Sequence, residues 1–263
     1  MKNIIVCIKQ VPDTNEVKID KATNTLVREG VPSIINPFDE NAIETAVSLK
    51  EKYGARVIVI SMGPPQAEEA LKKAWAMGAD EVILISDRAF AGSDTWATSY
   101  VLSKTIEKIN SYDLIIFGKQ AIDGDTAQVG PGVAELLNLP QITYVSEIEY
   151  IKEDKAVKVK REIEDGYEMI ESKLPAVMTV LKEVNEPRYP SFKKLIQVKK
   201  MAVEKWGASQ IDTEENKIGL DGSPTKVVKI FNPPPKGSSE IFNGPAKDMV
   251  QKLYKEIKNK KII

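Results

Sequence analysis

The chain has 263 residues, 42% hydrophobic and 29% charged, with a formal net charge of −1. This balance is typical of a folded protein with one large or two modest domains, and it gives no reason to expect nucleic acid or an anionic membrane as a partner. Histidine is absent and Cys7 is the single cysteine, which excludes histidine-dependent triads and internal disulfides and disfavours zinc. A cofactor would therefore carry any demanding chemistry.

Targeting signals are not apparent in the sequence. No apolar run approaches the roughly 20 residues that a membrane-spanning helix needs. The N-terminus turns polar soon after Ile8 and has no small-residue cleavage site, so we expect no signal peptide. A lone cysteine suits a reducing compartment, and we expect a cytoplasmic protein.

The first 140 residues alternate short apolar runs with amphipathic segments, which predicts parallel strands joined by helices. Asn36 and Pro37 are typical of the start of a helix, which Gly54 would end. The polar stretch 13–30 is expected to form a hairpin that turns near Thr23. We expect strands at 3–9, 56–62, 81–86 and 112–117, and helices at 37–53, 66–77, 95–110 and from 133. The sequence thus predicts an α/β fold, a Rossmann-like, doubly wound, mainly parallel sheet.

The pattern changes after Pro140. Four strands joined by tight turns are expected at 142–150, 155–163, 166–172 and 176–181, as an antiparallel extension of the sheet or a flap beside it. A short basic helix is expected at 191–201, with its lysines on a solvated face. Residues 207–239 lack periodicity and are interpreted as an extended arm, and 244–258 form a strongly amphipathic helix. The apolar stripe of that helix has to be buried on its own domain or on a different chain.

The segment Gly118–Pro131 follows a predicted strand and contains three glycines, two aspartates, a threonine and two glutamines. Ligands of open parallel sheets bind beyond the carboxyl ends of strands, and free N–H groups at a helix start favour an anion. We interpret the segment as a nucleotide loop, with an ordinary strand-to-helix connection as the alternative. It is neither a GxGxxG fingerprint nor a P-loop.

Right-handed crossovers would place the loops after the first, second and fourth strands at one edge of the sheet. The segments 7–9, 36–39, 61–63 and 118–129 are therefore expected to converge on one pocket. On pattern alone, Cys7 and Met62 are packing residues rather than cofactor contacts.

Five segments, 6–12, 36–40, 76–80, 118–131 and 185–189, resemble the beta subunit of electron-transfer flavoproteins in residues, order and spacing. The resemblance implies a heterodimer whose alpha subunit carries a redox-active FAD. It also implies a nucleotide-binding domain over 1–203 and a C-terminal arm and helix over 204–263 that dock on the alpha subunit.

The same resemblance implies the residues of two sites. The nucleotide contacts carried over by motif are Cys7, Asn36, Pro37, Phe38, Asp39, Met62, Gly118, Lys119, Gln120, Ala121, Ile122, Asp123, Gly124, Asp125, Thr126, Ala127, Gln128 and Val129. A recognition loop for an acyl-CoA dehydrogenase-type flavoenzyme is carried over to Val184, Asn185, Glu186, Pro187, Arg188 and Tyr189, with Val184 where the family places an apolar anchor.

The buried nucleotide is AMP in ordinary members of that family and a second FAD in electron-bifurcating members. Residues 123–131 resemble the loop of bifurcating, nitrogen-fixation-associated and caffeyl-CoA-reductase-like members. Small residues at 124, 127 and 130 suit close approach of a pyrophosphate, so we expect FAD. It would take hydride from NADH and pass electrons to ferredoxin or flavodoxin and to the dehydrogenase-type partner. The alternatives are structural AMP without a redox centre here, and a stand-alone adenosine-phosphate sensor resembling universal stress proteins.

Overall fold

The computed structural model describes residues 1–13, 19–20, 25–26, 32–198, 200–228 and 239–262. The chain divides into two compact units, Met1–Val228 and Lys229–Ile263, and each is described by itself. The expected boundary after residue 203 falls inside the first unit, because residues 204–206 form a strand of its main sheet. Docking of the arm on an alpha subunit stays a prediction.

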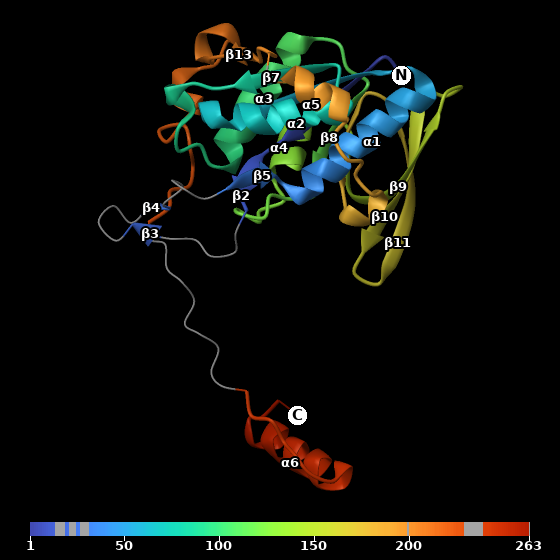
Figure 1. Ribbon diagram of the computed structural model, residues 1–263, viewed down its shortest axis with the longest axis vertical. Helices are drawn as coiled ribbons and strands as arrows, with labels where there is room; N and C mark the ends of the chain where they lie inside the picture. The colour runs from blue at the N-terminus through green and yellow to red at the C-terminus, as the bar shows by residue number, and fades with distance from the viewer. Residues whose placement is uncertain (14–18, 21–24, 27–31, 199, 229–238, 263) are drawn as a thin grey trace. The chain divides into compact units, whose positions relative to one another are not determined.

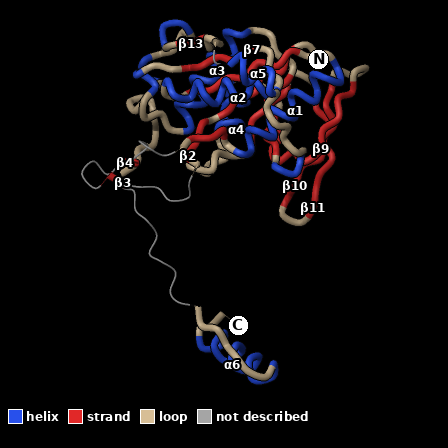
Figure 2. The backbone as a smooth tube through the Cα atoms, viewed as in Figure 1, coloured by secondary structure: helices blue, strands red, loops and turns tan. Residues whose placement is uncertain are grey.

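A nine-stranded sheet forms the centre of the first unit (Figure 2). The strands β9, β10 and β11 form one edge, at the right of Figure 1. Only the pairings of β10 are antiparallel among those of the described sheet, so the predicted mainly parallel sheet with an antiparallel extension is confirmed. The spatial order is β11 (Gly166–Lys173), β10 (Ala156–Ile163), β9 (Gln141–Ile151), β12 (Ala176–Val180), β8 (Leu114–Gly118), β1 (Asn3–Ile8), β6 (Arg56–Met62), β7 (Glu81–Ile85) and β13 (Glu204–Trp206).

Helices cover both faces of the sheet, because successive strand residues point to opposite faces. Ile4 and Val6 belong to the core cluster that includes residues of α1 (Pro37–Tyr53) and α2 (Glu68–Met77). Ile5 and Cys7 belong to the cluster that includes residues of α3 (Thr95–Ile109) and α4 (Val129–Leu136). The sheet is thus doubly wound, as the alternation of strands and helices predicts.

The position of β12 in the sheet differs from the one expected for strands joined by tight turns. Instead of extending the edge after β11, it pairs in parallel with both β8 and β9. Every residue of β12 is buried, whereas most of β11 is exposed. A strand that is apolar on both faces belongs inside a sheet, which explains the insertion.

Two small ladders lie in the excursion after β1. The strands β2 (Gln10–Pro12) and β5 (Ser33–Ile35) pair antiparallel and lead the chain into α1. The strands β3 (Ile19–Asp20) and β4 (Thr25–Leu26) also pair antiparallel, as the predicted hairpin requires. The turn expected near Thr23 lies outside the described residues.

The first part of the expected arm is folded onto the main unit. Ile211 and Ile218 are buried in the cluster of α3 and α4, and the carboxylate of Asp94, which caps α3, accepts the backbone N–H of Thr225 at 2.9 Å. Short 3-10 turns occur at Pro65–Ala67, Arg88–Phe90, Lys182–Val184, Ala208–Gln210 and Glu215–Lys217.

Two further helices complete the described structure. The basic segment forms α5 (Phe192–Val198), and the second unit contains α6 (Ala246–Asn259), which has no buried residue. Its apolar residues Val250, Leu253 and Tyr254 are exposed. Among the helices that the structure describes, none combines the length and apolar character that crossing a membrane requires.

Candidate functional site

The carboxyl ends of β1, β6 and β8 lie side by side at one end of the sheet. We call this end, with the segments 7–9, 36–39, 61–63 and 118–129, the rim. β1 lies between β6 and β8 and is parallel to both. Ile8 is level with Ser61, and Cys7 is level with Phe117, so the loops that follow these strands start side by side. The segments 7–9, 36–39, 61–63 and 118–129 thus lie at the same end of the sheet, and their convergence on one pocket stays a prediction.

Asp39, in the first turn of α1, joins two of these strand ends. Its side chain is buried, with Oδ2 accepting the N–H of Lys9 at 2.7 Å and Oδ1 accepting the N–H of Gly118 at 3.2 Å. A Cβ on Gly118 would lie 2.3 Å from Asp39 Oδ1 and 2.6 Å from the carbonyl carbon of Phe38, so only glycine fits. Burial raises the pKa of Asp39 to about 7, against the opposing effect of its hydrogen bonds.

Asn36 holds the start of the loop. Its side chain is buried; Nδ2 donates to the carbonyl of Gln120 at 2.8 Å, and Oδ1 accepts the N–H of Ile122 at 3.1 Å. The residue stands at the N-cap position of α1, as predicted. Its side chain makes no capping hydrogen bond, because the amide nitrogen and the amide oxygen both bind the loop. Lys9 Nζ adds an ion pair with Asp123 at 2.7 Å.

The middle of the loop lies at the surface. Residues 122–126 are exposed, and a Cβ on Gly124 would meet no atom within 4 Å. Asp125 and Ala127 have φ of 56° and 53°, a conformation that non-glycine residues adopt uncommonly and that concentrates at functional sites. The hydrogen bond from Asp125 N–H to the carbonyl of Ala121, 2.8 Å, closes the turn.

The helix α4 begins at Val129 without a side-chain cap in the described structure. Pro131 has no N–H, so the N–H groups of Val129 and Gly130 and the positive end of the helix dipole remain to interact with an anion. Packing within the chain, rather than a ligand, explains glycine at position 130. A Cβ on Gly130 would lie 2.7 Å from Thr179 Cγ2 of β12. The exposed loop and the helix start without a side-chain cap fit a phosphate group.

The other predicted contacts occupy the borders of the loop. Lys119 donates its N–H to the carbonyl of Val180 at 2.8 Å. The hydroxyl of Thr95 donates to Gln128 Oε1 at 3.4 Å, and Thr126 is exposed. Gln120 donates its side-chain amide to Asp125. Pro37 and Phe38 are half-buried, and Val129 packs half-buried against the cluster of α3 and α4.

Cys7 and Met62 direct their side chains into the core beneath the rim. Cys7 is buried, and Met62 packs half-buried against the same cluster. Burial, and then the charge of Asp39, raise the pKa of the Cys7 thiol, which disfavours a reactive thiolate. Ser61 belongs to the predicted segment 61–63, and its hydroxyl is buried and has no hydrogen-bond partner among the described residues. A polar residue after the apolar run 57–60 is the signal that marks it.

Comparison with known proteins gives the same family as the segment resemblance. Residues 23–211 match the electron transfer flavoprotein domain family. Over 262 residues, the chain is 55% identical to the electron transfer flavoprotein subunit beta of Thermoanaerobacterium thermosaccharolyticum, covering 99% of this chain and 100% of that protein. The chain belongs to the electron transfer flavoprotein family, as a beta subunit.

Two other relatives have more specific names. The beta subunit is 50% identical over 262 residues to the caffeyl-CoA reductase-Etf complex subunit CarD of Acetobacterium woodii, with 99% of each chain covered. It is 49% identical over 238 residues to protein FixA of Azotobacter vinelandii, covering 88% of this chain and 84% of that protein.

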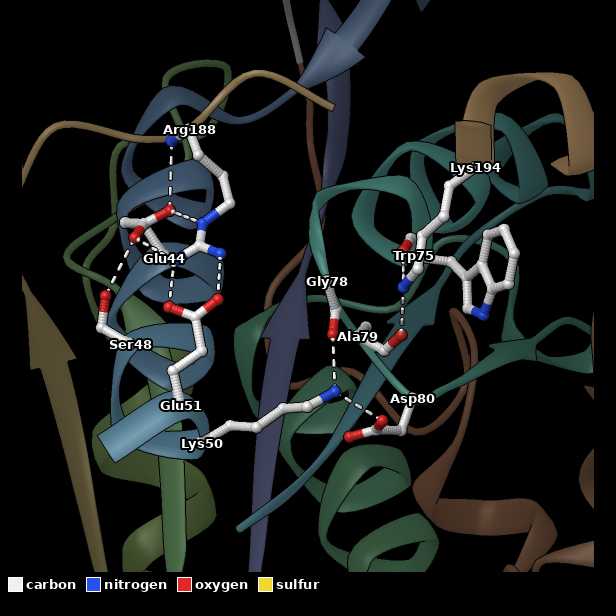
Figure 3. Close-up of polar contacts among 10 residues, drawn as sticks. All are labelled: Glu44, Ser48, Lys50, Glu51, Trp75, Gly78, Ala79, Asp80, Arg188 and Lys194. Atoms are coloured by element: carbon white, nitrogen blue, oxygen red, sulfur yellow. Dashed lines mark hydrogen bonds and ion pairs between the residues drawn. The ribbon is translucent and has the colours of Figure 1, made fainter. Parts of the chain in front are cut away.

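The predicted recognition loop of this beta subunit lies against α1. Val184 packs half-buried against the core cluster that includes residues of α1 and α2, and its role as the apolar anchor stays a prediction. Asn185 and Asn41 form reciprocal hydrogen bonds. Arg188 forms ion pairs with Glu44 and Glu51 of α1 (Figure 3). Glu186 is exposed, Pro187 is half-buried, and Tyr189 is 95% exposed.

Sequence reasoning missed the apolar residues that follow this loop. Phe192 is 80% exposed and Ile196 is 59% exposed, with Leu195 exposed beside them. Their signal is the presence of large apolar residues in a short basic helix that was interpreted as a solvated face. Within the described residues, no cluster of acidic or thiol side chains is arranged to hold a metal.

Proposed function

We propose that this beta subunit pairs with an alpha subunit and holds FAD at the rim, as part of an electron-bifurcating electron transfer flavoprotein. The observation that carries the proposal is the loop 118–129, whose base is fixed by buried side chains while its middle, residues 122–126, is exposed. The side chains of Asn36 and Asp39 form their hydrogen bonds with backbone groups of this same chain. They would thus position the loop, and the nucleotide would be bound largely by backbone groups.

The exposed residues of the loop would make the direct contacts. The N–H groups at the start of α4 would bind phosphate oxygens, and the Thr126 hydroxyl would add a donor. Asp123 or Asp125 would orient a ribose hydroxyl, and the open space above Gly124 would admit the pyrophosphate. When bound, FAD would supply hydride acceptance from NADH and delivery of single electrons to ferredoxin or flavodoxin and, through the alpha-subunit FAD, to an acyl-CoA dehydrogenase-type partner.

Two observations support FAD over AMP. The loop sequence 123–131 resembles that of bifurcating members, and the name of the relative CarD places it in a complex with a reductase of a CoA thioester. The alternative is AMP as a purely structural ligand. It is favoured by the packing of Gly130 against Thr179, which removes one of the three small residues that pointed to a pyrophosphate.

The test is the coenzyme content of the purified heterodimer. We expect two FAD per heterodimer, both reducible by NADH under anaerobic conditions. One FAD together with one AMP would overturn the FAD assignment and leave the structural-AMP alternative. A Thr126→Val variant serves as the site control, because it removes an exposed hydroxyl at nearly constant volume. It should retain less of the nucleotide bound at this rim while the alpha-subunit FAD stays at one equivalent.

A further inference from the structure

Tyr144, within β9, has a backbone conformation that large side chains rarely adopt. Its φ is 60°, in the left-handed region. The register of β9 shifts against both of its neighbours between residues 142 and 147, so Tyr144 lies at a β-bulge. Bulges redirect side chains and occur often beside functional sites, and a bulky residue in the left-handed region costs free energy.

Side chains of the neighbouring strands hold this bulge in place. Arg161 of β10 donates from Nε to the carbonyl of Thr143 and from Nη2 to the Thr143 hydroxyl, both at 3.1 Å. On the other side, the N–H of Tyr144 donates to the hydroxyl of Thr179 in β12 at 3.2 Å. A costly conformation that is fixed by contacts on both sides points to a role for the side chain that it directs.

The bulge lies level with the rim. Val145 pairs with Val180 of β12, and Val180 pairs with Gly118 at the end of β8. The centre of the Tyr144 ring lies 5.2 Å from Nζ of Lys119, the next residue of the rim loop. In the sheet, β12 and β9 follow β8 on the side away from β1 and β6. Tyr144 therefore adds an aromatic side chain to a side of the rim where sequence reasoning expected none.

The start of α4 approaches the same bulge. Thr179, which accepts the N–H of Tyr144, also lies where a Cβ on Gly130 would come within 2.7 Å. Lys119 and Tyr144 are half-buried, and neither side chain has a hydrogen bond or an ion pair within the part of the chain that the structure describes. Backbone N–H groups at a helix start, an ammonium group and a phenol all donate to phosphate oxygens.

We propose that the rim site extends past the start of α4 to Tyr144, whose hydroxyl, together with Lys119, binds the second phosphate of a dinucleotide. This assignment rests on the proposed function, in which the ligand at the rim is FAD. A mononucleotide at the ends of β1, β6 and β8 would stop short of β9, whereas a pyrophosphate would continue past the start of α4. The bulge fixes the ring before the ligand arrives, which lowers the ordering cost of binding.

The test measures the dissociation constant for FAD at the rim, on purified heterodimer that keeps the alpha-subunit FAD after dialysis. For Tyr144→Phe, which loses only the hydroxyl, we expect Kd to rise about tenfold, as for a lost hydrogen bond to a charged group. Lys119→Met should have a similar effect, and Lys119→Arg should restore binding because it keeps the charge. The matched control is Tyr150→Phe on the same strand. The Tyr150 hydroxyl accepts the N-terminal amine of Met1 at 2.9 Å, so Kd should change less than about twofold.

A second measurement on the same dialysed heterodimers separates binding from folding. Tyr144→Asn removes the ring, but asparagine adopts the left-handed region more readily than tyrosine. Its urea midpoint should therefore stay the same or rise, while Kd for FAD rises at least about tenfold. Lys155 is exposed in a turn and has φ of 48°. Lys155→Asn is the control for relief of strain, and it should leave Kd unchanged.

Unchanged Kd in Tyr144→Phe and Tyr144→Asn, with two FAD in the wild-type heterodimer, would overturn this proposal and leave the proposed function intact. A fall in the urea midpoint of Tyr144→Asn that accounts for its loss of FAD would overturn it as well, since the ring would then serve folding. Release of the alpha subunit at unchanged affinity for FAD would also overturn it, because the ring would then serve a subunit contact. One FAD and one AMP in the wild-type heterodimer would overturn both proposals.

Discussion

The rim loop and the start of the predicted docking segment, residues 185–188, are both held by α1, but by side chains of different character. At the rim, Asp39 is buried and accepts two backbone N–H groups, and burial raises its pKa to about 7. At the docking segment, burial alone would raise the pKa of Glu44. The hydrogen bonds from Arg188 outweigh this effect, so the pKa of Glu44 is lowered. One support therefore changes charge near neutral pH and the other does not. The comparison predicts that the rim responds to pH and the docking segment does not.

The largest effect is expected from removal of the rim support. Asp39→Ala leaves the N–H groups of Lys9 and Gly118 without acceptors, each at a cost of about 1–3 kcal/mol. At pH 6, where Asp39 is mostly protonated, we expect a loss of about 2–5 kcal/mol in the free energy of unfolding, measured by urea denaturation. Glu40→Ala is the matched control, because that residue pairs with Lys73 at the surface and should cost less than about 1 kcal/mol. Equal stability of the two variants would contradict the role assigned to Asp39.

The stability that Asp39 contributes at the rim should depend on pH near neutrality. The folded-state pKa of Asp39, about 7, lies above its ordinary value of 3.8, so folding takes up a proton and stability falls as pH rises between about 4 and 7. Between pH 5 and 8 the fall should be on the order of 2–3 kcal/mol. Asp39→Asn cannot titrate and should abolish most of it, as urea denaturation across this pH range will show.

Over the same pH range the docking segment should stay fixed. The folded-state pKa values of Glu44 and Glu51 are lowered by Arg188, so their contribution is present above the ordinary value of 4.5 and is lost only at more acid pH. Hydrogen exchange over 185–198, corrected for its intrinsic pH dependence, should be constant from pH 6 to 8. A change in this segment as large as the change at the rim would remove the distinction between the two supports.

Two glycines of the loop separate packing from ligand approach. Gly118→Ala would place a Cβ against the backbone of Phe38 and against Asp39, and overpacking of this kind costs about 1–3 kcal/mol. Gly124→Ala meets no atom of the chain, so it should leave the free energy of unfolding of the nucleotide-free protein unchanged within about 0.5 kcal/mol. If phosphates approach the backbone there, Gly124→Ala should nonetheless lower the nucleotide content measured after purification. Unchanged content would mean that the ligand does not pass over Gly124.

Most of the fold was predictable because its strands are apolar runs of the right length and its helices begin and end at recognisable residues. The convergence at the rim followed from parallel topology alone. The insertion of β12 was not predictable, since its pairing with β8 depends on burial on both faces and not on the turn that precedes it. The folding of 207–228 onto α3 was missed because isolated apolar residues such as Ile211 and Ile218 carry no periodic signal.

The candidate sites were predictable as segments but not as side-chain roles. Sequence spacing placed Asn36 and Asp39 at the rim, but it could not show that their polar atoms bind the chain itself. In the same way, a run such as 184–189 indicates a loop without showing which neighbouring apolar residue faces solvent. That distinction needs the packing, which turns Val184 inward and leaves Phe192 outside.

Substitution of Val184 and of Phe192 should separate folding from docking. Val184→Ala removes half-buried packing and should cost about 1 kcal/mol of unfolding free energy, with little change in KM for acyl-CoA dehydrogenase. Phe192→Ala removes a side chain that is 80% exposed, so stability should stay the same while KM for the dehydrogenase rises at least about tenfold. Urea denaturation and steady-state assays of the two heterodimers measure both quantities. The reverse pattern, with Val184→Ala alone raising KM, would return the anchor to Val184 and require the segment to rearrange when the partner binds.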